Sequence, residues 1–360
     1  MFANSLGNNL SFTSFGESHG KGVGVVIDGL PAGMPLDLTH IQKRLNERRP
    51  GSSAWVSPRD EKDRVEVWSG VFQNQTTGAP ITLFIPNQNA HPRDYDHLKE
   101  VYRPSHADFT YQKKYGIRDH RGGGRSSARI TAGWVAAGAV AEQFLKHTGI
   151  EVLAYVKQIY HHALPNVPTD EEIRASYSLP LRCPHPNVAE LIKQAITEAQ
   201  EQKDSLGGIV GVRVLSMPIG LGEPVFKKLN AQLAHAMLSI NAVKGIQFGM
   251  GFEMSTLKGS QVNDLWTEKE GHIVTQTNFS GGLQGGISNG MPLTFEVAFK
   301  PTATLGKPQQ TVTIDGKEVV LEAQGRHDPC VVPRAVPIVS ALTYWVLADL
   351  WIAQQKQQYG

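Results

Sequence analysis

The pattern of apolar and polar positions predicts a chain that mixes strands with helices. Within 293–299 every odd-numbered position is Leu, Phe or Val, with Thr, Glu and Ala between them, which predicts a strand buried mainly on one face. Strands are also predicted at 23–27, 151–159 and 208–215.

Helices are predicted at 39–49, 131–147, 188–203 and 224–239. The second is rich in small residues and reads as buried, whereas the last has Pro224 in its first turn. The clearest amphipathic pattern is in 188–203, where one face carries Val188, Leu191, Ile192, Ala195 and Ile196.

The most apolar stretch, 336–352, contains Ser340, Thr343 and Asp349 and is marginally short for a membrane span. We therefore expect a buried helix from about Pro337 to Gln354, and no membrane association.

Two short segments, 311–314 and 318–321, flank the dipeptide Asp315-Gly316, which is typical of a hairpin turn; Lys317 can add a residue to the loop. The chain has no repeat of fixed period and no linker. These features predict one α+β domain over 1–360.

Composition narrows the class of protein. The 360 residues are 40% hydrophobic and carry a net charge of +2, which is low for a general nucleic-acid coat. The two cysteines, Cys183 and Cys330, lie too far apart for a disulfide framework, and the first twelve residues lack the pattern of a signal peptide. We therefore expect a cytoplasmic protein. With neither a His-Glu-x-x-His nor a Cys-x-x-Cys motif, we expect no metal.

The first polar segment with potential chemistry is 15–20, Phe-Gly-Glu-Ser-His-Gly. His19 is framed by glycines, whose lack of side chains lets a ligand approach closely. An ordinary glycine turn with a surface histidine is the alternative interpretation.

The second segment, 103–129, carries seven Lys or Arg residues against two acids and includes three consecutive glycines. It leads into the helix predicted from Thr131, where backbone N–H groups and arginines can bind a polyanion. The alternative is a solvated basic loop or an RNA-binding Arg-Gly segment.

The third segment, 325–330, places Asp328 beside an arginine and a histidine, and Arg334 follows. Such a carboxylate can handle protons, since its neighbours tune its acidity. An exposed turn held by ion pairs is the alternative. Two lesser segments are glycine-rich 280–290 and the Lys-Pro-Thr-Ala-Thr run at 300–304.

Together these segments resemble the chorismate synthase family. FGESHG, RPSHADFTYQKKYGIRDHRGGGRSSAR and GRHDPCVVPRAVPIV are similar to its three signatures, in the same order. LSINAVKGIQFG at 238–249, GGISNG at 285–290 and KPTAT match further family segments, so the resemblance covers nearly the whole chain.

The resemblance implies a single-domain β-α-β sandwich that assembles as a homotetramer. It implies a lyase that eliminates phosphate from 5-enolpyruvylshikimate-3-phosphate in an anti 1,4-elimination, giving chorismate for aromatic amino acid biosynthesis. The family requires reduced flavin mononucleotide (FMN). No added domain for flavin reduction is visible, so we expect an external reductase; whether the chain uses NADPH itself stays open.

Residue by residue, the resemblance implies catalytic roles for His19, His106 and Asp328. It implies substrate contacts from Arg48, Arg103, Ser127, Ala128, Arg129 and Arg326. It implies flavin contacts from Arg125, Ser126, Ser127, Asn241, Ala242, Gly285, Lys300, Pro301, Thr302, Ala303, Thr304 and Arg326. Two positions depart from the family pattern: Ala54 stands where many relatives have arginine, and Ser105 where glycine is common.

Two other functions compete with this reading. A flavin-dependent oxidoreductase would produce a net redox change in its substrate. An RNA- or anion-binding protein would show salt-sensitive affinity and no bound flavin, and the near-neutral net charge argues against it.

Overall fold

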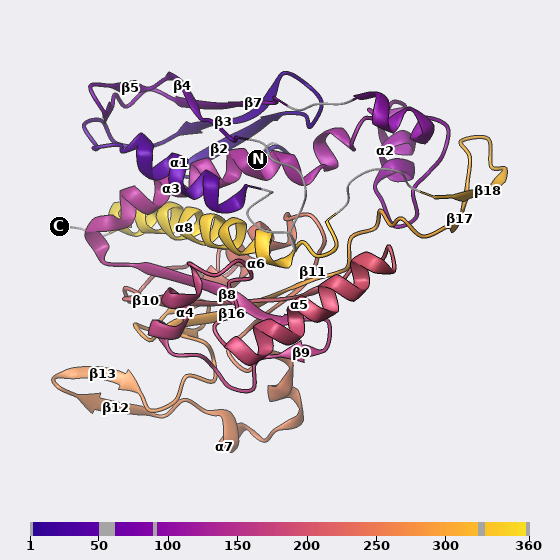
Figure 1. Ribbon diagram of the computed structural model, residues 1–360. Helices are drawn as coiled ribbons and strands as arrows, with labels where there is room; N and C mark the ends of the chain where they lie inside the picture. Colours follow the sequence, from indigo (N-terminus) through magenta and orange to yellow (C-terminus); the bar gives the residue numbers. More distant parts are fainter. Residues whose placement is uncertain (1–2, 50–61, 89–91, 323–327, 358–360) are drawn as a thin grey trace.

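In the computed structural model, residues 3–49, 62–88, 92–322 and 328–357 are described. Two antiparallel five-stranded sheets lie on opposite sides of a layer of helices (Figure 1). The first sheet has the strand order β1-β2-β3-β7-β4. Its strands are β1 Ser5–Leu6, β2 Ser11–Gly16, β3 Gly22–Asp28, β7 Ile81–Pro86 and β4 Glu66–Ser69.

The second sheet has the order β11-β16-β10-β8-β9. Its strands are β11 Val243–Phe248, β16 Leu293–Phe299, β10 Gly208–Leu215, β8 Glu151–Ile159 and β9 His162–Ala163. The alternation in β16 does place its Leu, Phe and Val side chains in the core, with the intervening residues half-buried. The predicted strands at 151–159 and 208–215 are confirmed as β8 and β10, and 23–27 lies within β3.

The helical layer consists of α1 Leu38–Arg48, α3 Thr131–Leu145, α6 Leu229–Leu238 and α8 Val332–Gln357. Small residues let α3 and α8 approach closely, because a Cβ at Gly138 would overlap the backbone of Ala341. One continuous hydrophobic cluster includes residues from both sheets and from these helices.

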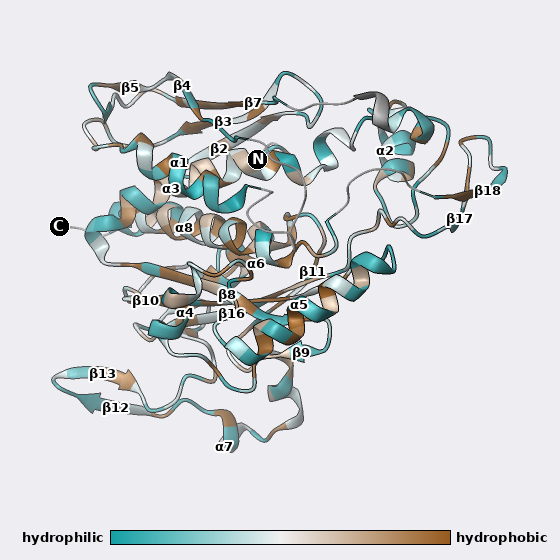
Figure 2. Ribbon diagram, in the orientation of Figure 1, coloured by the Kyte–Doolittle hydropathy of each residue, from teal (hydrophilic) through white to brown (hydrophobic). Residues whose placement is uncertain are grey.

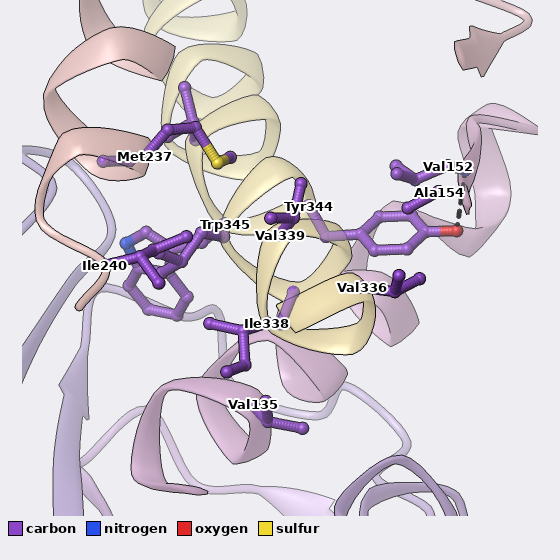
Figure 3. Packing of buried hydrophobic residues seen from close by; sticks show 14 of the residues in the cluster. Val135, Val152, Ala154, Met237, Ile240, Val336, Ile338, Val339, Tyr344 and Trp345 are labelled. Atoms are coloured by element: carbon purple, nitrogen blue, oxygen red, sulfur yellow. Dashed lines mark hydrogen bonds between the residues drawn. The ribbon is translucent and has the colours of Figure 1, made fainter. Parts of the chain in front are cut away.

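Helix α8 contacts both sheets through consecutive residues. The ring of Trp345 lies edge-on to Phe12 of β2 at 4.8 Å, and its Nε1 donates to the carbonyl oxygen of Leu6. The hydroxyl of Tyr344 accepts a hydrogen bond from the backbone N–H of Val152 in β8 at 3.0 Å. Figure 3 shows the two side chains leaving α8 in different directions. The helix therefore holds the two sheets together.

The buried character predicted for the last helix is confirmed. Helix α8 is long and apolar enough to cross a membrane, but 83% of its most apolar window is buried inside the protein. Asp349, near its end, accepts hydrogen bonds from the backbone N–H groups of Asn8, Asn9 and Leu10. The start of the chain is thus bonded to its last helix.

The remaining elements lie around these layers. They are α2 Asp108–Tyr115, α4 Asp170–Ser176, α5 Pro186–Glu201, α7 Gly259–Val262, β5 Val71–Phe72, β6 Gln75–Thr76, β12 Trp266–Lys269, β13 His272–Thr275, β14 Leu283–Gln284, β15 Ile287–Ser288, β17 Gln309–Val312 and β18 Glu318–Leu321.

Several predicted boundaries differ from the structure. Helix α6 begins at Leu229, whose N–H donates to Gly286, so Pro224 lies outside it. Helix α8 begins before Pro337 and continues through it. The free energy gained by burying the residues around Pro337 outweighs the loss of the one backbone hydrogen bond that proline cannot donate. The hairpin pairs Val312 with Glu318, which makes its loop longer than the Asp-Gly turn.

Helix α5 carries alternating hydrophobic and hydrophilic residues along its length, brown and teal in Figure 2. The prediction that Leu191 belongs to its buried face is wrong. Its side chain is 45% exposed, whereas Val188, Ile192, Ala195 and Ile196 are buried. At 100° per residue, Leu191 lies at the margin of that apolar stripe, so the packed face is narrower than the pattern.

A partly buried carboxylate joins α1 to α3 and predicts acid sensitivity. Glu142 on α3 accepts hydrogen bonds from His40 and Arg44 on α1, each at 2.8 Å. Burial alone would raise the pKa of Glu142, but these two partners lower it to about 2. A lowered pKa means that the stabilisation is complete above the ordinary glutamate pKa and is lost as pH falls towards 2.

We expect Glu142→Gln to be less stable than the unmodified chain by on the order of 3 kcal/mol at pH 7, with the gap closing below pH 4. Urea unfolding at a series of pH values measures this. Glu151→Gln is the control, because Glu151 and Arg174 form a surface pair and should contribute under about 1 kcal/mol. If the difference in unfolding free energy between Glu142→Gln and the unmodified chain did not change with pH, the lowered pKa of Glu142 would be contradicted.

Candidate active site

Two histidines far apart in the chain meet at one glycine dipeptide. His19 lies in the turn between β2 and β3, and His106 lies just before α2. A Cβ on Gly122 would overlap His19 Nε2, and one on Gly123 would lie 3.3 Å from His106 Nε2. The two imidazoles therefore lie against adjacent residues, whose Cα atoms are about 3.8 Å apart.

We expect Gly122→Ala to reduce turnover by roughly 10²-fold, because the new methyl group displaces His19 by a large fraction of an ångström. Gly116→Ala is the matched control: both glycines have positive φ, +63° and +73°, but the Gly116 site is open. Both variants should lose about 1 kcal/mol of stability from backbone strain. Steady-state kinetics with thermal unfolding separates the effects, and similar turnover in the two variants would contradict the contact.

His106 is bonded to a buried aspartate at the first residue of α2. Its Nδ1 lies 3.0 Å from Asp108 Oδ1. Arg103 binds the same carboxylate through Nε and Nη2 at 2.7 and 2.8 Å, and Arg118 Nη1 lies 3.1 Å from it. Burial alone would raise the pKa of Asp108, but Arg103 and His106 hold it well below the usual range.

A second buried carboxylate lies between two arginines. Asp63 Oδ2 accepts from Arg48 Nη1 at 3.0 Å, and Asp63 Oδ1 pairs with Arg129. Arg48 also donates to the Ala128 carbonyl and the Thr131 hydroxyl, and it is only 2% exposed. Burial lowers the pKa of Arg48 to about 10, with Asp63 opposing that shift. The side chains of Arg48, Asp63 and Arg129 together carry a net charge of +1.

Asn87 connects this cluster to the His19 turn. Its amide Nδ2 lies 2.9–3.1 Å from the carbonyl oxygens of Glu17, Ser18 and Gly20, which surround His19. Its Oδ1 accepts from Arg129 Nε at 2.9 Å. The position of His19 is therefore tied to that of Arg129.

Two 3-10 turns, Gly124–Ser126 and Ala128–Ile130, precede α3. Ser126 Oγ donates to the Gly123 carbonyl at 2.7 Å, and Ser127 Oγ accepts from the Arg129 N–H at 3.2 Å. Arg125 donates to the carbonyl oxygens of Ser14 and Gly16, so its guanidinium attaches this segment to β2.

The predicted flavin segments continue from these turns. Asn241 Nδ2 donates to the Ser126 carbonyl at 2.7 Å, and the Ala242 carbonyl accepts from Lys300 N at 2.9 Å. Thr302 Oγ1 donates to the Asp328 carbonyl at 3.2 Å. Asp328 in turn forms an ion pair with Arg334 of α8, whose charge also acts on Arg48.

Most of the predicted site residues therefore form one connected set. Pro301, Ala303 and Thr304 lie in the same loop as Lys300 and Thr302. Gly285 belongs to the β14–β15 turn, where its neighbour Gly286 contacts Lys228 and Leu229. A Cβ on Gly285 would have no other described atom within 4 Å, so the structure does not join this residue to the set. Arg326 and Ala54 lie outside the described residues.

The arginines of 103–129 are engaged within the protein. Arg103 and Arg118 bind Asp108, Arg121 binds Asp119, Arg125 binds β2, and Arg129 binds Asp63. A solvated basic loop or an RNA-binding segment needs its guanidinium groups to face solvent. These contacts disfavour both alternatives.

Three residues important to this geometry were missed by sequence reasoning: Asp63, Asn87 and Asp108. Asp108 had a local signal, since it follows His106 by two residues within the same motif. Asp63 lies among other charged residues and Asn87 in a short polar stretch, and neither pattern sets them apart.

Comparison with known proteins decides the family. The family model described as chorismate synthase matches residues 10–352. The chain belongs to the chorismate synthase family. A chorismate synthase from Opitutus terrae is 52% identical over 358 residues, covering 98% of each chain, and one from Parabacteroides distasonis is 50% identical, covering 99% of each.

A crystal structure of chorismate synthase matches 97% of this chain and 93% of its own, with a TM-score of 0.77 and 33% identity. The α+β fold expected for the chorismate synthase family is thereby confirmed. Members of this family are lyases, and the chain is an enzyme of that class.

The described residues fit a flavin, as the chorismate synthase family would require. Asn241 Oδ1 is buried without a hydrogen-bond partner among the described residues, so it can accept from the N–H or O–H group of a ligand. The pKa of Lys300 is lowered first by partial burial and then by the positive charge of Lys244. An anionic phosphate bound between these two lysines would stabilise both charges. Ala242 has a φ of +68°, a strained backbone typical of functional sites.

Proposed function

We propose that this chain eliminates phosphate from 5-enolpyruvylshikimate-3-phosphate by an anti 1,4-elimination that yields chorismate and requires reduced FMN. The observation that carries the proposal is the Arg48–Asp63–Arg129 cluster, tied through Asn87 to the histidine of the glycine-framed turn. It combines a net positive charge with groups that can transfer protons.

The charge of the cluster suits the substrate, which carries a phosphate and two carboxylates. Two arginines share one carboxylate, so these three side chains together carry one more positive than negative charge, which attracts an anionic ligand. Arginine binds phosphate and carboxylate through paired N–H groups. Arg129 is the more exposed of the two, with 9% of its side chain accessible against 2% for Arg48. We assign ligand contact chiefly to Arg129 and positioning chiefly to Arg48.

The elimination needs a group to stabilise the leaving phosphate and a place for the departing ring proton. His19 would serve the phosphate, because Asn87 fixes its turn next to Arg129. Asp328, held by Arg334 and Thr302, would relay the ring proton. His106 would contact the flavin through Nε2, the nitrogen on the side of Gly123.

Asn241, Ala242, Ser126 and the 300–304 loop would hold the flavin. When bound and reduced, FMN supplies electron density and a basic ring nitrogen without net redox change. The family resemblance further supports a cytoplasmic homotetramer that depends on an external flavin reductase.

An anaerobic assay tests the proposal. Purified protein, chemically reduced FMN and 5-enolpyruvylshikimate-3-phosphate are mixed, and phosphate, chorismate and the flavin spectrum are followed together. We expect equal amounts of phosphate and chorismate with the flavin still reduced. Flavin oxidised in proportion to substrate would instead indicate an oxidoreductase, and bound flavin without product would reject the proposed reaction.

A further inference from the structure

We infer that Asp108 is a positioning residue that fixes the tautomer of His106 and thereby makes Nε2 its working nitrogen. The inference depends on the proposed function only for the reaction that His106 serves. The assignment of the His106 proton to Nδ1 rests on the distance between Nδ1 and Asp108 Oδ1, and not on the reaction.

The contact is specific in both partners. An ionised carboxylate accepts hydrogen bonds but cannot donate one. Because Asp108 Oδ1 lies 3.0 Å from His106 Nδ1, the proton of the neutral imidazole must reside on Nδ1. Nε2 then carries a lone pair on the side of Gly123, the residue next to the glycine that His19 contacts.

Asp108 is built to remain ionised and immobile. It is 4% exposed, and its Oδ2 accepts from both the backbone N–H and the Nε of Arg103, at 3.1 and 2.7 Å. Arg118 closes the other side: its Nη2 donates to the Leu98, Lys99 and Val101 carbonyls. The carboxylate has no room to rotate away from His106.

This geometry also changes the role of Arg103. The Nε and Nη2 edge that would grip a phosphate or carboxylate of a ligand is occupied by Asp108. Through this edge Arg103 acts on the reaction by way of Asp108 and His106, while its three remaining N–H groups, one on Nη2 and two on Nη1, can contact a ligand.

The tautomer can be measured directly. Full-length protein is labelled with ¹⁵N-histidine, and the His106 resonances are assigned by their loss in His106→Gln. At a pH where the imidazole is neutral, we expect the signature of a protonated Nδ1 and an unprotonated Nε2. A protonated Nε2 would overturn the inference, whatever the enzyme assay shows.

Kinetics provides the second test. In Asp108→Asn the carboxamide keeps the shape but can donate to Nδ1, which moves the imidazole proton to Nε2. We expect kcat to fall by roughly 10–100-fold with KM little changed, and no further fall when Asp108→Asn is added to His106→Ala. An equal loss in that background would reject the positioning role.

Asp170→Asn is the matched control, because Asp170 is likewise the first residue of a short helix and pairs with Arg213 at 2.8 Å. It should leave kcat unchanged. If Asp108→Asn does not fold, the tautomer of the unmodified protein still decides. If the unmodified protein releases no chorismate, the proposed function is rejected. The NMR measurement still tests the tautomer of His106, because it does not require turnover.

Discussion

Asp63→Ala is expected to lose about 3–5 kcal/mol of unfolding free energy, because it leaves the buried Arg48 and the largely buried Arg129 without their shared counter-charge. Asp63 is fully buried, and both of its oxygens are used, one by Arg48 and one by Arg129. Burial raises the pKa of Asp63, but these two cations lower it overall. Its stabilisation is therefore present above the ordinary aspartate pKa and is lost as pH falls below it.

Urea unfolding of both proteins at neutral pH measures the loss. Asp204→Ala is the control, since Asp204 pairs with Lys307 on the surface and should contribute under about 1 kcal/mol. Inorganic phosphate should stabilise Asp63→Ala more than the unmodified chain, because an anion can replace the missing carboxylate. A loss no greater than that of Asp204→Ala would mean that the arginines find other partners.

His106→Ala is expected to lower kcat by about 10²–10⁴-fold, the range for removing a proton-transferring side chain. The fold should persist, because the imidazole is 18% exposed and Asp108 keeps both of its arginines. The chemical change is thus confined to the site.

Anaerobic turnover with reduced flavin, together with the thermal unfolding midpoint, checks this expectation. His272→Ala, which alters an exposed histidine on β13, should leave both quantities unchanged. Unchanged kcat in His106→Ala would remove this residue from the reaction. A large fall in the midpoint would instead assign it a structural role.

Periodicity predicted the regular elements because burial on one face leaves a direct record in the sequence. Strand β16 and helix α3 followed their patterns closely. Boundaries failed where tertiary contacts decided them. Helix α6 starts where a backbone N–H reaches the β14–β15 turn, and Leu191 faces solvent because α5 packs on a narrow stripe.

The site was predicted through motifs, which identify residues that touch ligands better than residues that hold others in place. His19 and His106 were recognised in their motifs, but their shared contact at Gly122 and Gly123 depends on backbone folding. Asp63 could not be found, because its role exists only when Arg48 and Arg129 are brought to it from two other segments. Spacing along a chain does not encode such long-range charge pairing.

The position of α8 has a consequence for synthesis. The helix that joins both sheets is translated after every other described element, about 190 residues after the β8 amide that Tyr344 binds. At roughly 5–20 residues per second, β8 waits on the order of 10–40 s for that partner. During this interval the second sheet lacks the helix that covers β8 and β10, so nascent chains of this enzyme should depend on chaperones until their final helix emerges.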